Sequence, residues 1–209
     1  EMLRSLVGSE MCIRDSYESY KIVVTPDVLE IPLEAQGMAI FGANHVDGSG
    51  GSERLIAHEL AHQWFGNSVG VARWQDIWLN EGYACYSEWL WSEAAGGPTA
   101  HAKARSHHAS LRILPQDLVL SDPGPTDMFD DRVYKRGALT LHALRLTIGY
   151  ERFFTLTREW TSRFAGLAVT SDDFLGLVDE IADGQARALV RTWIDELPLP
   201  ALPAARPRR

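Results

Sequence analysis

His58-Glu59-Leu60-Ala61-His62 is the stretch around which this chain is organised. It has the pattern H-E-x-x-H, and the sequence around it is typical of a helix. On a helix, His58 and His62 lie one turn apart on the same face, close enough to bind one metal ion. Imidazole nitrogens suit zinc, and Glu59 beside them is placed to act as a general base toward a zinc-bound water. The alternative is a surface helix that carries two solvated histidines.

A second stretch, Trp78-Leu79-Asn80-Glu81-Gly82-Tyr83-Ala84, offers the third protein ligand that two histidines leave missing. Glu81 follows His62 after eighteen intervening residues, which is far enough for a second helix to cross the first. His58, His62 and Glu81 would bind one zinc ion per chain and leave its fourth position to water. That arrangement is typical of a catalytic rather than a structural zinc site.

Together the two stretches, H-E-L-A-H-Q-W-F-G-N and W-L-N-E-G-Y-A, resemble the zinc aminopeptidases of the aminopeptidase N and leukotriene hydrolase type. These enzymes are gluzincin metallopeptidases. The resemblance extends from about Tyr20 to about Pro203. It implies a thermolysin-like catalytic domain that removes residues from the N-terminus of peptides.

A third motif, Val133-Tyr134-Lys135-Arg136-Gly137-Ala138, is similar to the family's Tyr-Glu-Lys-Gly-Ala motif. Lys135 stands where Glu is usual and Arg136 where Lys is usual, but the tyrosine is kept. The resemblance implies that Tyr134 donates a hydrogen bond to the oxyanion of the tetrahedral intermediate, because a phenol of pKa about 10 stays protonated. A core tyrosine on a helix is the alternative.

Substrate binding is expected at Ile31-Pro32-Leu33-Glu34-Ala35, which corresponds to the family's Gly-x-Met-Glu-Asn strand. Glu34 lies twenty-four residues before His58, and a carboxylate suits a substrate's α-ammonium group. The flanking Gly, Met and Asn of the family are absent, which leaves the strand geometry open. Gln36 and Gly37 would then line the cleft. The alternative for Glu34 is a surface carboxylate at the start of a strand.

Two further residues are expected to support the metal site. Glu88 lies seven residues after Glu81 on the same helix face, where it could orient a zinc-binding histidine. A solvated helix carboxylate is an equal alternative for Glu88. Asn80 is expected to fix the backbone or the carboxylate of Glu81.

Composition restricts the possible classes of protein. The chain has 209 residues, of which 45% are apolar, and this supports one sizeable core. A net charge of −8 gives no electrostatic support for nucleic-acid binding. No apolar run approaches the roughly 18 residues of a membrane span, and no signal peptide is recognised, so the compartment stays open. Cys12 and Cys85 provide neither a disulfide framework nor a C-x-x-C metal site.

The chain is interpreted as a fragment with three parts. Residues 1–16 do not resemble the family and are set aside as a leader, either an artefact or disordered. Residues 17–197 are expected to form the catalytic domain, and the tail rich in proline and arginine, 198–209, is expected to be disordered. Family members usually carry a β-rich domain upstream. Its absence here predicts an exposed apolar patch where it would dock.

The order of elements predicts an α+β fold, with a small β lobe followed by a mostly α-helical lobe. Strands are expected at about 20–24 and 38–41. Ser52 is expected to cap the metal helix, which Gly66-Asn67 would end. Further helices are expected at about 75–95, 99–114, 132–147, 150–165, 171–182 and 185–196.

These observations favour a zinc-dependent metallo-aminopeptidase whose partner is a peptide with a free N-terminus. If Glu34 does not reach the cleft, a metallo-endopeptidase of the same fold is the alternative. A zinc-binding but inactive fragment, completed by missing neighbours, is the third hypothesis. Neither nucleic acid nor a membrane is expected as a partner.

Overall fold

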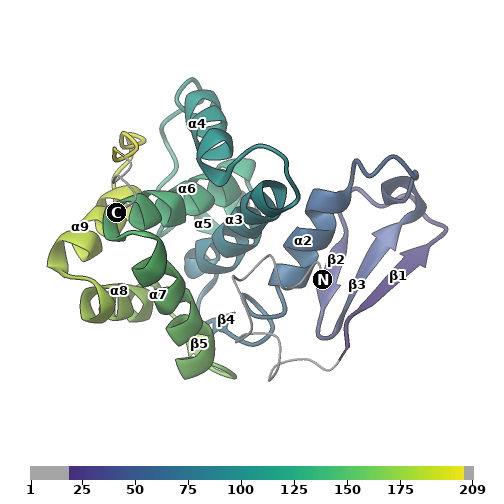
Figure 1. The fold of residues 1–209 in the computed structure, drawn as a ribbon, viewed down its shortest axis with the longest axis horizontal. Coiled ribbons are helices and arrows are strands. Elements are labelled where there is room, and N and C mark those ends of the chain that lie inside the picture. Colours follow the sequence, from purple (N-terminus) through teal and green to yellow (C-terminus); the bar gives the residue numbers. More distant parts are fainter. Residues whose placement is uncertain (1–18, 205–209) are drawn as a thin grey trace.

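A computed structural model of the chain describes residues 19–204. The small β lobe and the larger helical lobe lie on opposite sides of helix α2 (Glu53–Ala61), as Figure 1 shows. The β lobe is a three-stranded sheet in the order β1-β3-β2, where β1 pairs in parallel with β3 and β2 pairs antiparallel to it. Its elements are β1 (Lys21–Thr25), β2 (Leu33–Ala35), β3 (Met38–Gly42) and the 3-10 helix η1 (Ala43–His45).

The helical lobe follows α2 in the chain, and α3 and α6 pack against each other at its centre (Figure 1). Its helices are η2 (Trp74–Asp76), α3 (Trp78–Ala94), α4 (Ala100–Leu111), α5 (Gly124–Asp127), α6 (Asp131–Ile148), α7 (Tyr150–Arg163), α8 (Ser171–Ile181) and α9 (Gly184–Asp195). Two short strands, β4 (Gly70–Val71) and β5 (Ala168–Val169), pair in parallel. The prediction of an α+β fold with a small β lobe before a helical lobe is confirmed.

The metal helix differs from its prediction at both ends. Ser52 precedes the helix, but its side chain makes no capping hydrogen bond, because its backbone lies outside the extended region that an N-cap requires. The helix ends at Ala61 rather than at Gly66-Asn67, because the chain tightens into turns there. His62 keeps helical backbone angles and its N–H still bonds to the carbonyl of His58, so the two rings stay on one face.

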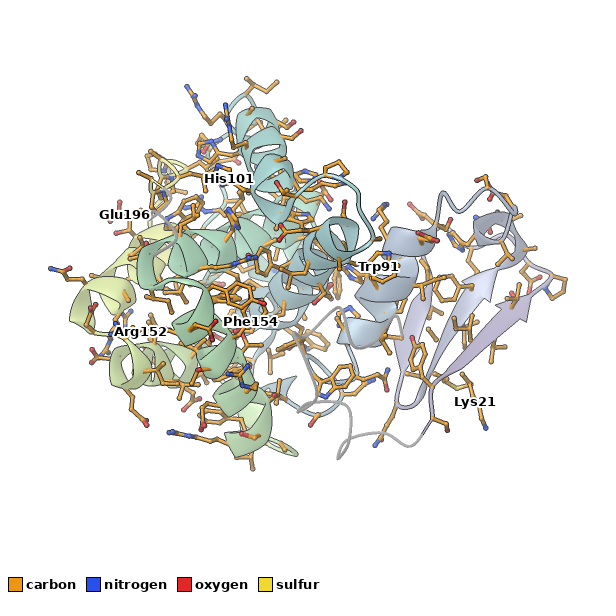
Figure 2. The ribbon with its side chains drawn as sticks, viewed as in Figure 1. Lys21, Trp91, His101, Arg152, Phe154 and Glu196 are labelled. Atoms are coloured by element: carbon orange, nitrogen blue, oxygen red, sulfur yellow. The ribbon has the colours of Figure 1, made fainter. Side chains whose placement is uncertain are left out.

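Aromatic side chains fill the helical lobe. Trp78, Trp89, Trp160 and Trp193 are fully buried there. Figure 2 shows Phe154 of α7 among the side chains inside this lobe, whereas Lys21 of β1 lies at the outer edge of the β lobe. Burial of such rings is the main stabilising contribution to a fold of this size.

The crossing of α3 and α6 is set by two glycines. A Cβ built on Gly82 would lie 2.9 Å from the backbone of Gly137, and a Cβ built on Gly137 would lie 2.8 Å from the Cα of Gly82. Real Cβ atoms are essentially never found so close to a backbone. The two helices can therefore approach this closely only with glycine at both positions. Glu81 is the neighbour of Gly82, and Tyr134 lies one turn before Gly137, so this crossing brings both side chains to one site.

Substituting either glycine with alanine tests this crossing. Alanine in a helix interior is usually about 1 kcal/mol more favourable than glycine. At Gly82 or Gly137 we expect the opposite, a loss of about 1–3 kcal/mol in the free energy of unfolding, because the added methyl group overpacks the contact. Gly176→Ala in α8 is the control, since nothing lies within 4 Å of its Cβ position, and it should stabilise the fold. Urea unfolding measures all three variants. A Gly137→Ala protein as stable as Gly176→Ala would contradict the argument.

Arg136 joins α6 to the C-terminal end of α9. Its buried guanidinium donates from Nε to the carbonyl of Trp193 at 2.8 Å and from Nη1 to the carbonyl of Leu197 at 3.0 Å. Nη2 donates to the carbonyl of Glu196. The end of a helix leaves such carbonyls without partners, and Arg136 satisfies them. Arg136, which stands where the family has lysine, thus ties α6 to the end of α9.

Residues 198–204 follow a defined path along α4, in contrast to the disorder expected from Pro198. The N–H of Leu199 donates to Oε1 of Gln116 at 2.9 Å, and Nε2 of His108 donates to the carbonyl of Pro200 at 2.8 Å. Leu199 and Leu202 pack against the core. Apolar contacts therefore outweigh the composition of this segment as far as residue 204. The leader 1–16 and the last five residues lie outside the described residues.

The β lobe exposes several large apolar side chains. Six large apolar side chains between residues 22 and 33 are 36–81% exposed. They are Ile22, Val23 and Val24 of β1, Val28 and Ile31 of the following loop, and Leu33 of β2. Monomeric proteins rarely expose contiguous apolar surface without a partner. Across the described residues, no helix combines the length and the apolar character needed to cross a membrane.

Candidate metal centre

Helices α2 and α3 bring His58, His62 and Glu81 together. One ligand atom from each of these buried side chains lies within 4.8 Å of the other two. Oε2 of Glu81 is 3.3 Å from Nε2 of His58 and 3.6 Å from Nε2 of His62. The two imidazoles therefore face the same carboxylate oxygen, from one face of α2.

Hydrogen bonds at the far side of each ring determine which nitrogen faces the site. Nδ1 of His58 bonds to Oε1 of Glu88 at 2.8 Å, and Nδ1 of His62 bonds to the carbonyl of Phe65 at 3.0 Å. A carboxylate and a carbonyl only accept, so each Nδ1 carries the hydrogen. In the neutral rings, each Nε2 is then left with a lone pair that points toward Glu81.

This donor set fits a zinc ion. Ligands about 2.0–2.1 Å from a tetrahedral zinc ion lie roughly 3.3 Å from one another. The separations of 3.3 and 3.6 Å between the two Nε2 atoms and Oε2 of Glu81 match that spacing. Two imidazoles and one carboxylate are also the ligand types of catalytic zinc sites. The residues therefore fit zinc in both chemistry and spacing.

The carboxylates around the donor set favour a positive charge at this position. Burial alone would lower the pKa of His58, but hydrogen bonds to Glu81 and Glu88 outweigh it and raise that pKa to about 9. Burial would likewise raise the pKa of Glu88, but the hydrogen bond from His58 holds it below its usual value. Nη1 of Arg54 also contacts Oε2 of Glu88 at 3.2 Å. Glu88 is thus anchored between α2 and α3, where it orients the ring of His58.

Glu59 lies beside the donor set and has no hydrogen-bond partner at one oxygen. Its side chain is buried, and within residues 19–204 its Oε2 contacts no donor. Burial raises the pKa of Glu59 to about 7; the charge of His58 opposes this shift, and neighbouring carboxylates add to it. A buried carboxylate oxygen without a partner is costly, so this position suits a proton donor such as water. A pKa near neutrality suits a group that accepts a proton and returns it.

Tyr134 of α6 reaches the same site from the other side. Its ring stacks on His58 with 6.1 Å between the ring centroids and 24° between the planes. Burial raises the pKa of Tyr134, and the carboxylates of Glu81, Glu34 and Glu59 raise it further. The phenol therefore stays protonated and remains a hydrogen-bond donor at neutral pH.

Glu34 also reaches this site. A carboxylate oxygen of Glu34, one of Glu59 and a ring nitrogen of His62 all lie within 4.8 Å of one another. Glu34 is exposed on β2, the edge strand of the sheet, where it pairs with Ala39 of β3. The carboxylate of Glu34 thus lies on the solvent side of the site, next to the buried carboxylate of Glu59.

Gln36 and Gly37 form the turn between β2 and β3. Gln36 is exposed, whereas Gly37 is partly buried and has a φ of +76°, which glycine adopts without strain. The partly buried Asn80 lies near Gly66, where its Nδ2 is 3.7 Å from the position of a Cβ built on that glycine. Asn80 therefore lies beside the turns that follow the metal helix.

Two residues that sequence reasoning missed lie against the site. Gln63 follows His62 directly and bonds to the turn between β2 and β3. Tyr20 precedes β1, and its buried hydroxyl has no hydrogen-bond partner among the described residues. Burial and the charges of Glu59 and Glu34 raise the pKa of Tyr20. No local pattern marks either residue, because their contacts join segments that are distant in the sequence.

The sequence matches a known family over most of its length. A model described as the Peptidase family M1 domain matches residues 13–193. The chain belongs to peptidase family M1. This M1 chain is 30% identical to glutamyl aminopeptidase of Sus scrofa over 161 residues, which cover 71% of this chain and 17% of that protein. It is 35% identical to endoplasmic reticulum aminopeptidase 2 of Homo sapiens over 130 residues, covering 57% of this chain and 13% of that protein.

Solved structures give the same result for the fold. The M1 zinc metallopeptidase from Deinococcus radiodurans is 35% identical, with a TM-score of 0.83, and the match covers 98% of this chain and 44% of that one. Native yeast LTA4 hydrolase is 25% identical with a TM-score of 0.73, covering 89% and 33% of the two chains. The predicted resemblance to this family is confirmed. The M1 chain spans only 13–18% of the length of its curated relatives.

Proposed function

We propose that this M1 domain is a zinc metallo-aminopeptidase that removes residues from peptides with a free N-terminus. The observation that carries the proposal is the convergence of two groups at one site. A donor set with zinc spacing, His58, His62 and Glu81, adjoins a buried carboxylate without a partner, Glu59. The exposed carboxylate of Glu34 stands within 4.8 Å of Glu59 and His62, where a substrate's ammonium group would need an anion.

In this proposal His58, His62 and Glu81 hold one zinc ion per chain. Zinc in such a site supplies Lewis acidity, which makes water a stronger acid and polarises a substrate carbonyl. Glu88 and the carbonyl of Phe65 keep the two imidazoles in the orientation that this requires.

The protein's own groups then move protons and stabilise charge. Glu59 accepts a proton from the attacking water, for which its unpartnered Oε2 is available, and passes it to the leaving amine. Tyr134 donates its hydroxyl hydrogen to the oxyanion that develops on the attacked carbonyl. Glu34 binds the α-ammonium group and so places the first peptide bond at the site.

Hydrolysis of an aminoacyl chromogenic amide, compared with its N-acetylated twin, tests the substrate part of the proposal. We expect the zinc-loaded protein to cleave the free-amine compound and to leave the acetylated one intact, because acetylation removes the charge that Glu34 would bind. Equal cleavage of both would favour a metallo-endopeptidase. Cleavage of neither by protein that holds one zinc ion per chain would favour an inactive zinc-binding fragment.

We also propose that a β-rich domain upstream covers the exposed apolar face of the β lobe in the whole protein. The six exposed side chains between residues 22 and 33 support this. Among them, Val23 and Leu33 lie on one face of the sheet, because both pair with Ile40 of β3. Without that domain we expect the chain to self-associate through this face. The double variant Val23→Lys, Leu33→Lys should then shift the chain toward monomer in sedimentation experiments. Leu167→Lys, at an equally exposed leucine elsewhere, is the control. An unchanged distribution of species in the double variant would contradict the proposal.

A further inference from the structure

Gln63 connects the metal helix to the turn that follows Glu34. Its side chain is buried, and the residue is 1% exposed. The N–H of Gly37 donates to Oε1 of Gln63 at 2.6 Å, and Nε2 of Gln63 donates to the carbonyl of Ala35 at 2.9 Å. One side chain thus bonds to both sides of the turn between β2 and β3.

The chemistry of these two bonds requires an amide. The carbonyl of Ala35 needs a donor and the N–H of Gly37 needs an acceptor, and the two groups lie one residue apart across the turn. Glutamine offers both from one planar group, whereas a carboxylate only accepts and an apolar side chain does neither. Because Gln63 is buried, a substitution that removes one of these bonds would leave a backbone group of the turn without a partner. The fold would then lose the desolvation free energy of that group.

This link matters because β2 is a short edge strand. The strand is only three residues long and lies at the edge of the sheet, where it pairs with β3 alone. Glu34 is adjacent to Ala35, whose carbonyl accepts the bond from Gln63. Gln63 in turn is adjacent to His62, so one side chain links the turn beside Glu34 to the zinc donors.

We infer that Gln63 is a positioning residue, which holds Glu34 at the distance that selects substrates with a free α-amine. The inference rests on the proposed function, in which Glu34 binds that amine. A glutamine that only stabilised the fold would lower the affinity for every ligand alike or for none. A positioning residue instead changes the discrimination between free and blocked amines.

The experiment measures binding as well as turnover. The probes are amino acid amides and their N-acetylated twins, bound to zinc-loaded protein in a calorimeter, with hydrolysis of the chromogenic pair measured in parallel. Gln63→Met keeps the length of the side chain and removes both hydrogen bonds. We expect it to weaken binding of the free-amine amides by about 10- to 100-fold, since a displaced binding group loses most of its effect. Binding of the twins and zinc content should stay unchanged.

Two further proteins make the result decisive. In a Glu34→Ala background, Gln63→Met should add less than about a twofold loss, because a residue that acts only through Glu34 has nothing left to position. Gln116→Met is the control: Gln116 also bridges backbone groups, donating to the carbonyls of Leu111 and Leu114 at 2.9 Å, but it lies in the loop after α4, outside the elements that carry the candidate site. It should leave the discrimination between the probes unchanged.

Each outcome has one meaning. Equal losses for free and blocked amines, or losses that add to those of Glu34→Ala, would overturn the inference. If Gln63→Met does not fold, Gln63→Glu, which keeps the bond to Gly37, should show a smaller loss in the same direction, and unaltered discrimination there would overturn it. A wild type that discriminates in binding but does not hydrolyse would contradict only the proposed function. A wild type that does not discriminate in binding would overturn the inference itself.

Discussion

Replacing Glu59 with glutamine is expected to lower kcat by about 10²- to 10⁴-fold, the range for loss of a general base. Glu59 does not belong to the donor set of His58, His62 and Glu81, so the variant should still hold one zinc ion per chain. Glutamine has nearly the same shape but cannot accept a proton at neutral pH. Activity should therefore be lost without loss of metal or of fold.

The measurement is single-turnover hydrolysis of the aminoacyl amide, together with metal analysis of the same samples. Glu53→Gln is the matched control, because Glu53 is an exposed glutamate in the first turn of the same helix. We expect the control to keep wild-type kcat. A Glu59→Gln protein that retained more than about a tenth of wild-type kcat would exclude Glu59 as the base.

Replacing Glu81 with glutamine is expected to abolish the stabilisation that zinc gives to the fold. An ion that binds only the folded state at a thousand times its Kd stabilises it by about 4 kcal/mol. The expected result is therefore a wild type that loses about that much stability when a chelator removes zinc. In Glu81→Gln the difference between zinc-loaded and chelator-treated protein should nearly vanish, because two imidazoles alone bind zinc weakly.

Comparing each protein with itself removes the effect of the substitution on the metal-free fold, which matters because Glu81 also contacts His58. Urea unfolding with and without chelator gives the stabilisation by zinc for the wild type and for Glu81→Gln, and metal analysis gives their zinc content. Glu151→Gln, at an exposed glutamate of α7, is the control and should be stabilised by zinc as much as the wild type. If zinc stabilised Glu81→Gln as much as the wild type, Glu81 would be excluded as a ligand.

Much of the site could be predicted because its signals are local. Helix periodicity alone puts His58 and His62 on one face, and the same periodicity put Glu88 on the face of Glu81, where the structure finds it bonded to His58. The departures of Lys135 and Arg136 from the family motif were visible in the sequence, but the reason for Arg136 was not. Its partners are carbonyls at the end of α9, and no sequence pattern marks a carbonyl group.

The path of the tail shows where composition misleads. Residues rich in proline and arginine predict disorder because they bury little apolar surface of their own. Leu199 and Leu202 nevertheless find apolar surface that α4 and its neighbours already provide, and Gln116 and His108 bond to the backbone between them. The surface that orders the segment belongs to other elements, so the segment's own sequence could not reveal it.

The sequence by itself determined the donor set and its family, because two histidines one helical turn apart and a glutamate on the next helix are specified by residue type and spacing. Only the tertiary structure decided how the parts meet. Gly82 and Gly137 allow α3 and α6 to touch, and Gln63 bonds to a turn 26 residues earlier in the chain. Such contacts depend on the shape of two surfaces that pack together, and shape complementarity between distant segments leaves no periodic signal in one sequence.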